Sequence, residues 1–143
     1  MTRFWHNWFL AWCISIGVFG AVLAGAGFTA TEGPVSFVLV SLNGPSPVEF
    51  DPLLRFATAL MGAVTIGWAV TLYLLIGAAA DLGGKGRAIW NAITAGMVAW
   101  FVIDGCLSVA TGYGLNLIPN SLLAALYLIG LKGSGVLKLA TRQ

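Results

Sequence analysis

Residues 53–80 read LLRFATALMGAVTIGWAVTLYLLIGAAA, and this stretch decides the class of fold. Its one charged residue is Arg55, close to the start. A bilayer core of about 30 Å is crossed by a helix of about 20 apolar residues. Because lipid offers the backbone no hydrogen-bond partner, a crossing segment must be a helix unless its residues alternate as in a barrel strand. The stretch does not alternate, so it predicts a transmembrane helix.

Three further segments have the same character, namely residues 8–30, 88–111 and 117–137. The first is longer than the apolar core of a signal peptide, about 7–15 residues, which favours a retained span over a cleaved leader. Together the four segments predict an all-α membrane protein. We expect a single domain over residues 1–143, with four transmembrane helices in an antiparallel bundle.

The composition excludes several other classes of protein. Of 143 residues, 59% are hydrophobic and 8% are charged, and the net charge is +2. A soluble domain carries about 25% charged residues, and a disordered chain combines low hydrophobicity with high charge. A nucleic-acid binder needs a cluster of Lys and Arg to neutralise phosphates. The expected partner is therefore the lipid bilayer and not nucleic acid.

Basic residues fall on one side of the four-span arrangement. This side carries Arg3, Lys85, Arg87, Lys132, Lys138 and Arg142. The other side carries Arg55 with Glu32, Glu49 and Asp51. Because cytoplasmic loops of membrane proteins are rich in Lys and Arg, this pattern predicts that both termini are cytoplasmic. The expected location is the inner (plasma) membrane, in a multi-pass topology.

The connections between the predicted spans differ in length. Residues 81–87 and 112–114 are short and contain glycines, which permit the tight turns of helical hairpins. Residues 31–52 form a long outer loop, which ends in the helix-start signal Asp51-Pro52. Its apolar middle, residues 35–42, is too short to span a membrane. We expect it to be either extended or a short helix on the outer surface.

Small residues recur four positions apart in three of the predicted helices. The repeats are Gly17-Ala21-Gly25, Gly20-Ala24, Ala59-Ala63-Gly67 and Ala92-Gly96. Such spacing allows the backbones of membrane helices to approach closely. It indicates packing within the bundle or, alternatively, a seam with a second copy of the chain or with another membrane subunit.

Asp104 is the most informative polar residue. A carboxylate within a span costs about 2.5–3.5 kcal/mol on insertion scales, so Asp104 should face protein or water. It lies about seven residues, or roughly 10 Å, from the outer end of its helix. Arg55 lies near the outer end of the neighbouring helix, and a long guanidinium reaches far enough to make an Arg55–Asp104 ion pair plausible.

A candidate buried polar site follows from this pair. It comprises Arg55, Asp104, Thr58, Ser108, Thr65 and Trp100, which lie on matching helix faces by their spacing. One interpretation is a structural pair that holds the bundle together. Another is a polar cavity that opens outward and binds a ligand or relays a proton. In a third, Arg55 pairs locally with Glu49 or Asp51, and water solvates Asp104.

The remaining candidates favour structural roles. His6 is the one histidine, and a metal site needs several ligands, so no metal or cofactor is predicted. Cys13 and Cys106 lie near opposite faces of the bilayer, beyond disulfide reach. Four tryptophans have the spacing of an inner interfacial belt: Trp5, Trp8, Trp12 and Trp90. The lack of a nucleophile–base set argues against an enzyme.

The segment Glu49-Phe50-Asp51-Pro52-Leu53-Leu54-Arg55 leads from a long outer loop into a Gly-containing helix, and Asp104, Ser108 and Gly112 make a polar end to the next helix. In this layout the chain resembles small four-helix bacterial inner-membrane proteins of the DoxX-like and neighbouring uncharacterised families. The resemblance implies no established activity. Small multidrug-resistance transporters also have four helices, but they carry an acidic residue in the first helix, which this chain lacks.

Two functions are compatible with these features. The first is a non-enzymatic membrane protein that acts as an accessory or scaffold subunit or has an undefined role. The alternative is the binding or transport of a small lipophilic or anionic compound at an Arg55–Asp104 polar site.

Overall fold

The computed structural model describes residues 1–43 and 48–136, and every regular element in these ranges is helical. The main helices are α1 (Arg3–Ala24), α2 (Gly33–Asn43), α3 (Pro52–Asp81), α4 (Arg87–Ala110) and α5 (Leu117–Gly133). Short 3-10 turns connect them: η1 (Gly25–Gly27), η2 (Thr29–Thr31), η3 (Gly83–Gly86) and η4 (Gly114–Asn116). Leu137, Lys138 and Arg142, which entered the span and orientation predictions, lie outside the described residues.

Four of the helices, counted with their adjoining turns, are long and apolar enough to cross a membrane. These segments are Arg3–Gly27, Pro52–Asp81, Gly83–Ala110 and Gly114–Gly133. The prediction of an all-helical chain with four such segments is confirmed at this level. The first helix begins at Arg3, five residues before the start of the predicted span, so Trp5 also belongs to it.

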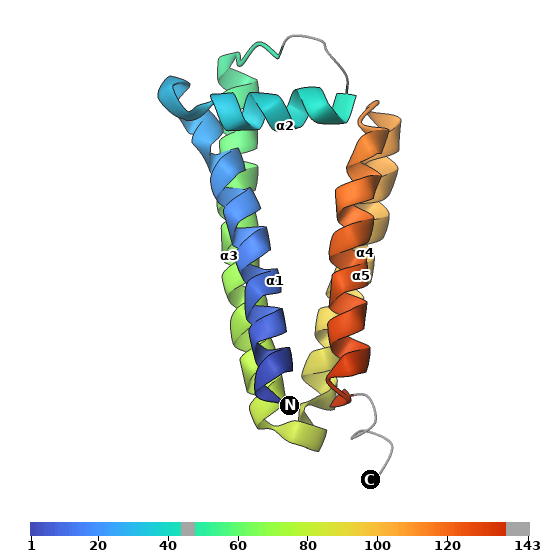
Figure 1. The fold of residues 1–143 in the computed structure, drawn as a ribbon. Helices are drawn as coiled ribbons and strands as arrows, with labels where there is room; N and C mark the ends of the chain where they lie inside the picture. Colours follow the sequence, from blue (N-terminus) through green and yellow to red (C-terminus); the bar gives the residue numbers. More distant parts are fainter. Residues whose placement is uncertain (44–47, 137–143) are drawn as a thin grey trace.

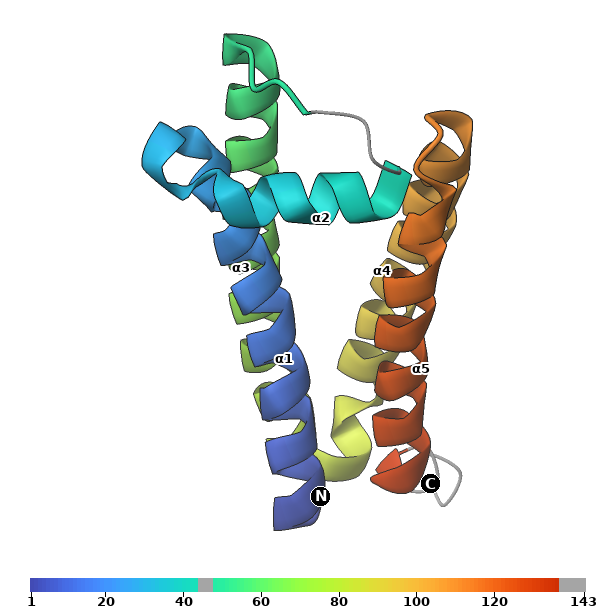
Figure 2. The ribbon, with the colours of Figure 1, turned by 45° about the horizontal axis from the view of Figure 1, so that its top comes forward.

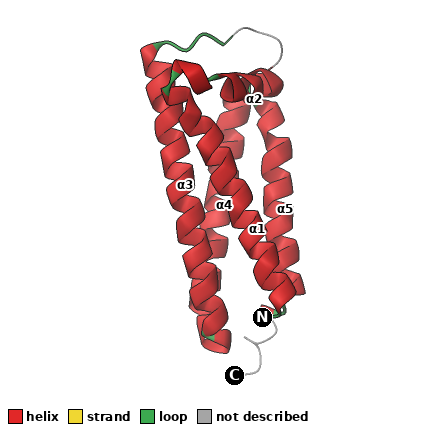
Figure 3. Ribbon diagram, turned by 60° about the vertical axis from the view of Figure 1, so that its left-hand side comes forward, coloured by secondary structure: helices red, strands yellow, loops and turns green. Residues whose placement is uncertain are grey.

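The long helices lie in two pairs (Figures 1 and 2). The chain runs along α1 and returns along α3, and it then runs along α4 and returns along α5. The two pairs approach each other at the end that holds the N-terminus and diverge toward the opposite end, where α2 lies across them (Figures 1 and 2). Figure 3 also shows α2 at the end of the molecule opposite the N-terminus. Of the two conformations expected for the outer loop, its apolar middle therefore adopts the short helix.

The helix starts and turns follow from local chemistry. Oδ1 of Asp51 accepts a hydrogen bond of 2.7 Å from the backbone N–H of Leu54, and Pro52 occupies the first position of α3. This satisfies one of the free N–H groups at the helix start. The turn between α3 and α4 contains Gly83 at φ +55°, and the turn after α4 contains Gly112 at φ +87°. Glycine adopts such positive φ angles without steric cost.

Glycines bring α1 and α3 into close contact. A methyl group at Gly62 of α3 would overlap the backbone of Gly20 and Ala24, and one at Gly20 would crowd Ile66. The small-residue pattern of the first helix therefore serves packing within the chain. Gly67 and Gly96, by contrast, face open space.

Aromatic side chains fill the core between the pairs at their convergent half. Phe9, Trp12, Trp90 and Tyr127 are each at most 3% exposed. The Nε1–H groups of Trp8 and Trp12 donate to the carbonyl oxygens of Leu126 and Leu123, over 3.1 and 3.0 Å, and so tie α1 to α5. The interfacial belt stays a prediction, and within the chain Trp12 and Trp90 do not turn their rings outward. Their indoles are buried among helices because α5 offers Trp12 a carbonyl acceptor and Phe9 packs against Trp90.

The contact between α1 and α3 can be tested with one methyl group. We expect Gly62→Ala to lower the free energy of unfolding in detergent by about 1–3 kcal/mol, as overpacking does, because the methyl group overlaps the α1 backbone. Gly67→Ala, five residues further along the same helix, is the matched control and should leave thermal stability and oligomeric state unchanged. Equal effects of the two substitutions would contradict this packing.

Candidate functional site

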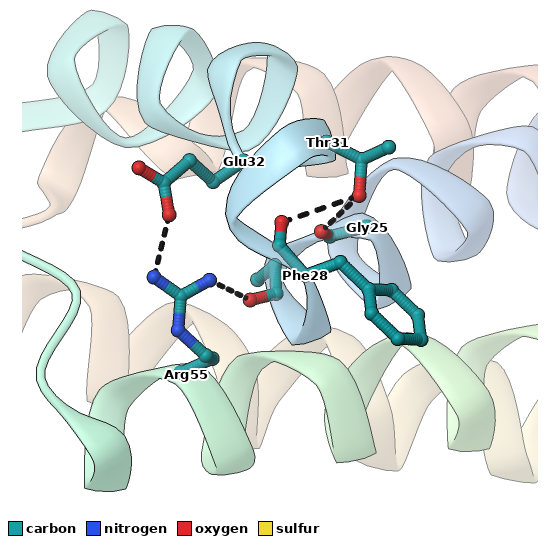
Figure 4. Close-up of polar contacts among 6 residues, drawn as sticks. Gly25, Phe28, Thr31, Glu32 and Arg55 are labelled. Atoms are coloured by element: carbon teal, nitrogen blue, oxygen red, sulfur yellow. Dashed lines mark hydrogen bonds and ion pairs between the residues drawn. The ribbon is translucent and has the colours of Figure 1, made fainter.

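Arg55 lies in the first turn of α3 and joins three segments of the chain (Figure 4). Its Nη2 lies 2.5 Å from Oε2 of Glu32, and its Nη1 donates a hydrogen bond of 2.7 Å to the carbonyl oxygen of Ala26. The guanidinium carbon also lies 5.5 Å from the centre of the Phe50 ring. Arg55 thus connects the end of α1, the start of α2 and the start of α3.

The turn between α1 and α2 places Glu32 against Arg55. The Thr31 hydroxyl donates to the carbonyl oxygens of Gly25 and Phe28, over 2.7 and 3.3 Å, and these bonds close the turn (Figure 4). The carbonyl oxygen of Glu32 accepts a hydrogen bond from the N–H of Ser36, so α2 begins directly after it. The side chains of Arg55 and Glu32 are 23% and 30% exposed, so the ion pair is only partly shielded from its surroundings.

Asp104 lies in a second polar cluster, formed by α4 and the start of α5. Its Oδ2 accepts hydrogen bonds from Nδ2 of Asn116, over 2.9 Å, and from Nδ2 of Asn120. The Ser108 hydroxyl lies 3.4 Å from the same oxygen and accepts a 3.0 Å bond from Asn116. Asn120 is 9% exposed and Asp104 is half-buried. We refer to Asp104, Ser108, Asn116 and Asn120 as the Asp104 cluster.

The expected Arg55–Asp104 ion pair is not formed. No hydrogen bond or ion pair between described residues joins the two side chains, because each has nearer partners. Glu32, at the end of the α1–α2 turn, neutralises Arg55, whereas the adjacent helix α5 supplies amide donors to Asp104. The local alternative is also wrong: it paired Arg55 with Glu49 or Asp51, whereas Arg55 binds Glu32 and Asp51 caps α3. It left Asp104 to water, whereas two amide groups of the chain donate to this carboxylate.

The six residues of the predicted polar site therefore do not come together in one site. Asp104 and Ser108 belong to the same cluster. Thr58 is buried in α3, three residues after Arg55, and the Thr65 hydroxyl donates to the carbonyl oxygen of Met61. Trp100 packs against Trp68 of α3, with ring centres 5.5 Å apart.

Three side chains that contact Arg55 or Asp104 were not predicted from the sequence, namely Glu32, Asn116 and Asn120. Asn116 and Asn120 are four residues apart at the start of the fourth apolar segment, a spacing that puts both on one helix face. In a helical hairpin, residues at equal distances before and after the turn lie side by side. Asp104 and Asn120 are each eight residues from Gly112, so their contact could have been predicted. Glu32 gave a weaker signal because the length of the outer loop leaves its position open.

The chemistry of the Asp104 cluster is that of a carboxylate held by neutral donors. It offers one negative charge and several polar oxygens, which suit recognition of a cation. Among the described residues, no group of three or more His, Cys, Asp or Glu side chains is placed to hold a metal ion.

No protein-family model matches the chain, and neither a curated protein nor a solved structure is significantly similar to it. The resemblance to DoxX-like proteins stays a prediction. The proposals below are therefore based on the contacts of Arg55 and on the geometry of the Asp104 cluster.

The pairing of Arg55 can be tested by double-mutant cycles of thermal stability in detergent. We expect Arg55→Gln and Glu32→Gln each to destabilise the protein by about 1 kcal/mol, as for a partly exposed pair, and the double variant to lose clearly less than the two combined. Arg55→Gln with Asp104→Asn should be additive within about 0.5 kcal/mol. Stronger coupling of Arg55 to Asp104 than to Glu32 would contradict the assignment.

Proposed function

We propose that this chain is a multi-pass integral protein of the inner membrane, in which the four long helices form an antiparallel bundle with both termini in the cytoplasm. The length and composition of the helices support insertion. Large apolar side chains that are more than half exposed also support it, because a soluble surface of this kind would aggregate. They include Phe56, Val64, Leu74, Val98, Ile103, Leu107 and Leu122.

The charge distribution supports the orientation. Arg3, Lys85, Arg87 and Lys132 lie toward the end of the molecule that holds the N-terminus, together with Asp81. Arg55 lies toward the other end with Glu32, Glu49, Asp51 and Asp104. The positive-inside rule then favours the first end as the cytoplasmic one.

We further propose a non-enzymatic role as an accessory or scaffold subunit. The observation that carries this proposal is that Arg55 binds Glu32 and the Ala26 carbonyl, and so holds the connection between α1 and α2 against the start of α3. A guanidinium neutralised in this way is not available to bind an anionic substrate. The polar chemistry of this end of α3 thus serves the architecture.

A second candidate function is the binding or transport of a small compound at the Asp104 cluster. The observation that favours it is a half-buried carboxylate whose described partners are all neutral. Because Arg55 is engaged elsewhere, we centre this candidate on Asp104 alone instead of an Arg55–Asp104 site. A negative carboxylate without a basic neighbour disfavours an anionic compound.

Reporter fusions test the membrane topology. With the full chain expressed in a bacterium, we expect green fluorescent protein fused after Gln143 to fluoresce and alkaline phosphatase at the same position to be inactive, because the C-terminus is cytoplasmic. Alkaline phosphatase inserted between Glu49 and Phe50 should be active. The reverse pattern would overturn the orientation.

Native mass spectrometry separates the two roles. An accessory or scaffold subunit, extracted with its lipids in a mild detergent, should retain partner chains in both the wild type and Asp104→Asn. A binding or transport protein should instead retain a small compound that Asp104→Asn loses. The absence of any retained chain from the wild type would count against the scaffold role.

A further inference from the structure

We propose that the Asp104 cluster binds a small organic ammonium ion that carries an apolar or aromatic group. This inference specifies the ligand class of the second candidate function, and it rests on the proposed insertion of α4 and α5 in the membrane. It is carried by the hydrogen bonding of Asp104, the separation of charge between the two ends of the molecule and the aromatic residues one turn before Asp104 on α4.

The hydrogen bonds of Asp104 are all on one of its carboxylate oxygens. Asn116, Asn120 and Ser108 donate to Oδ2, whereas no described residue donates to Oδ1. These neutral donors orient the carboxylate and leave its formal charge uncompensated. An ammonium N–H group at Oδ1 would supply both a hydrogen bond and the opposite charge, which makes a charge-assisted pair stronger than a neutral one.

The described residues supply no basic side chain to neutralise Asp104, so we expect its counter-ion to be a bound ligand. Arg55 is the one described basic residue toward the outer end, and Glu32 already neutralises it. The carboxylates of Glu49 and Asp51 make this end still more negative. Such an excess of one sign attracts ions of the other sign and disfavours anions.

The aromatic neighbours favour an organic ammonium ion over an inorganic cation. Trp100 lies four residues before Asp104, hence one turn away on the same face of α4. Its ring packs against Trp68 of α3 and also lies 6.3 Å from the Phe101 ring. Aromatic rings attract cations and bury apolar groups, so they suit the two parts of such a ligand.

Asp104 is partly shielded within its cluster, since it is half-buried and Asn120 is 9% exposed. The cluster lies at the diverging end of the α4–α5 pair, where α2 crosses from α1 (Figures 1 and 2). The far end of α2 reaches the turn after α4, since a methyl group at Gly112 would lie 3.7 Å from Oδ1 of Asn43. A carboxylate partly shielded from water binds a counter-ion more strongly than one on an open surface.

The test is a binding measurement with the full chain in nanodiscs of zwitterionic phosphatidylcholine, which carry no net charge of their own. The probe is 2-phenylethylammonium, and its controls of similar size are neutral 2-phenylethanol and anionic 3-phenylpropanoate. Isothermal titration calorimetry should show saturable binding of the ammonium ion, with both controls at least tenfold weaker. Equal binding of the anion and the ammonium ion would overturn the proposal.

Variants assign the binding to Asp104. Asp104→Asn should weaken binding of 2-phenylethylammonium at least tenfold, whereas Asp104→Glu, which keeps the charge, should retain it within a few fold. Glu49→Gln is the matched control, because it removes one carboxylate at the same end from a residue outside the cluster. If Asp104→Asn binds as tightly as Glu49→Gln, the proposal is wrong.

Two further readouts keep the test decisive. If Asp104→Asn does not remain monodisperse, the comparison of the three compounds on the wild type still decides for or against an ammonium site. The topology reporters show separately whether the chain is inserted as proposed. Failure of ammonium binding in a correctly inserted protein would overturn this inference and leave the proposed topology and scaffold role standing.

Discussion

The need to satisfy polar groups between long apolar helices is the constraint on which the rest of this structure depends. Within a membrane an unpaired polar group costs several kcal/mol, since no water replaces a missing partner. Arg55 and Oδ2 of Asp104, both toward the diverging end of the helices, find partners by separate means. Arg55 uses a carboxylate and a backbone carbonyl, whereas Asp104 uses a hydroxyl and two amides. In both cases the partners come from the nearest segment of the chain: the α1–α2 turn for Arg55, and α4 with the start of α5 for Asp104.

The same constraint acts on the aromatic residues at the convergent end. Trp8 and Trp12 donate to carbonyl oxygens of α5, and the hydroxyl groups of Thr94 and Tyr127 lie 2.8 Å apart. These bonds cross helix interfaces, so they fix the rotation of one helix against another in a way that apolar packing alone does not. Trp90 departs from the rule among the described residues, because its Nε1 is buried with no hydrogen-bond partner. Its contribution is the packing of its ring against Phe9.

The sequence predicts the helices well because their determinants are local. The apolar stretch 53–80 and the Asp51-Pro52 start signal correspond closely to α3, Pro52–Asp81. The polar partners are harder to predict, because they depend on how the helix pairs sit in space. Arg55 and Asp104 occur in α3 and α4, which are consecutive long apolar helices, yet these helices belong to different pairs that diverge at this end (Figure 1). The pairing of an arginine with a carboxylate was a sound expectation, whereas the choice among five carboxylates needed the structure.

The short helix α2 gives the two polar clusters a physical connection. Its first turn follows Glu32, which Arg55 holds against α3, and its last residue, Asn43, lies beside Gly112 at the top of the α4–α5 pair. The two pairs are farthest apart at this end, and α2 is the described element that bridges them there (Figures 1 and 2). Loss of the Arg55–Glu32 contact would free the start of α2 without touching Asp104 or its amide donors. Any effect of that loss on the Asp104 cluster must therefore pass through α2 or through a change in the separation of the two pairs.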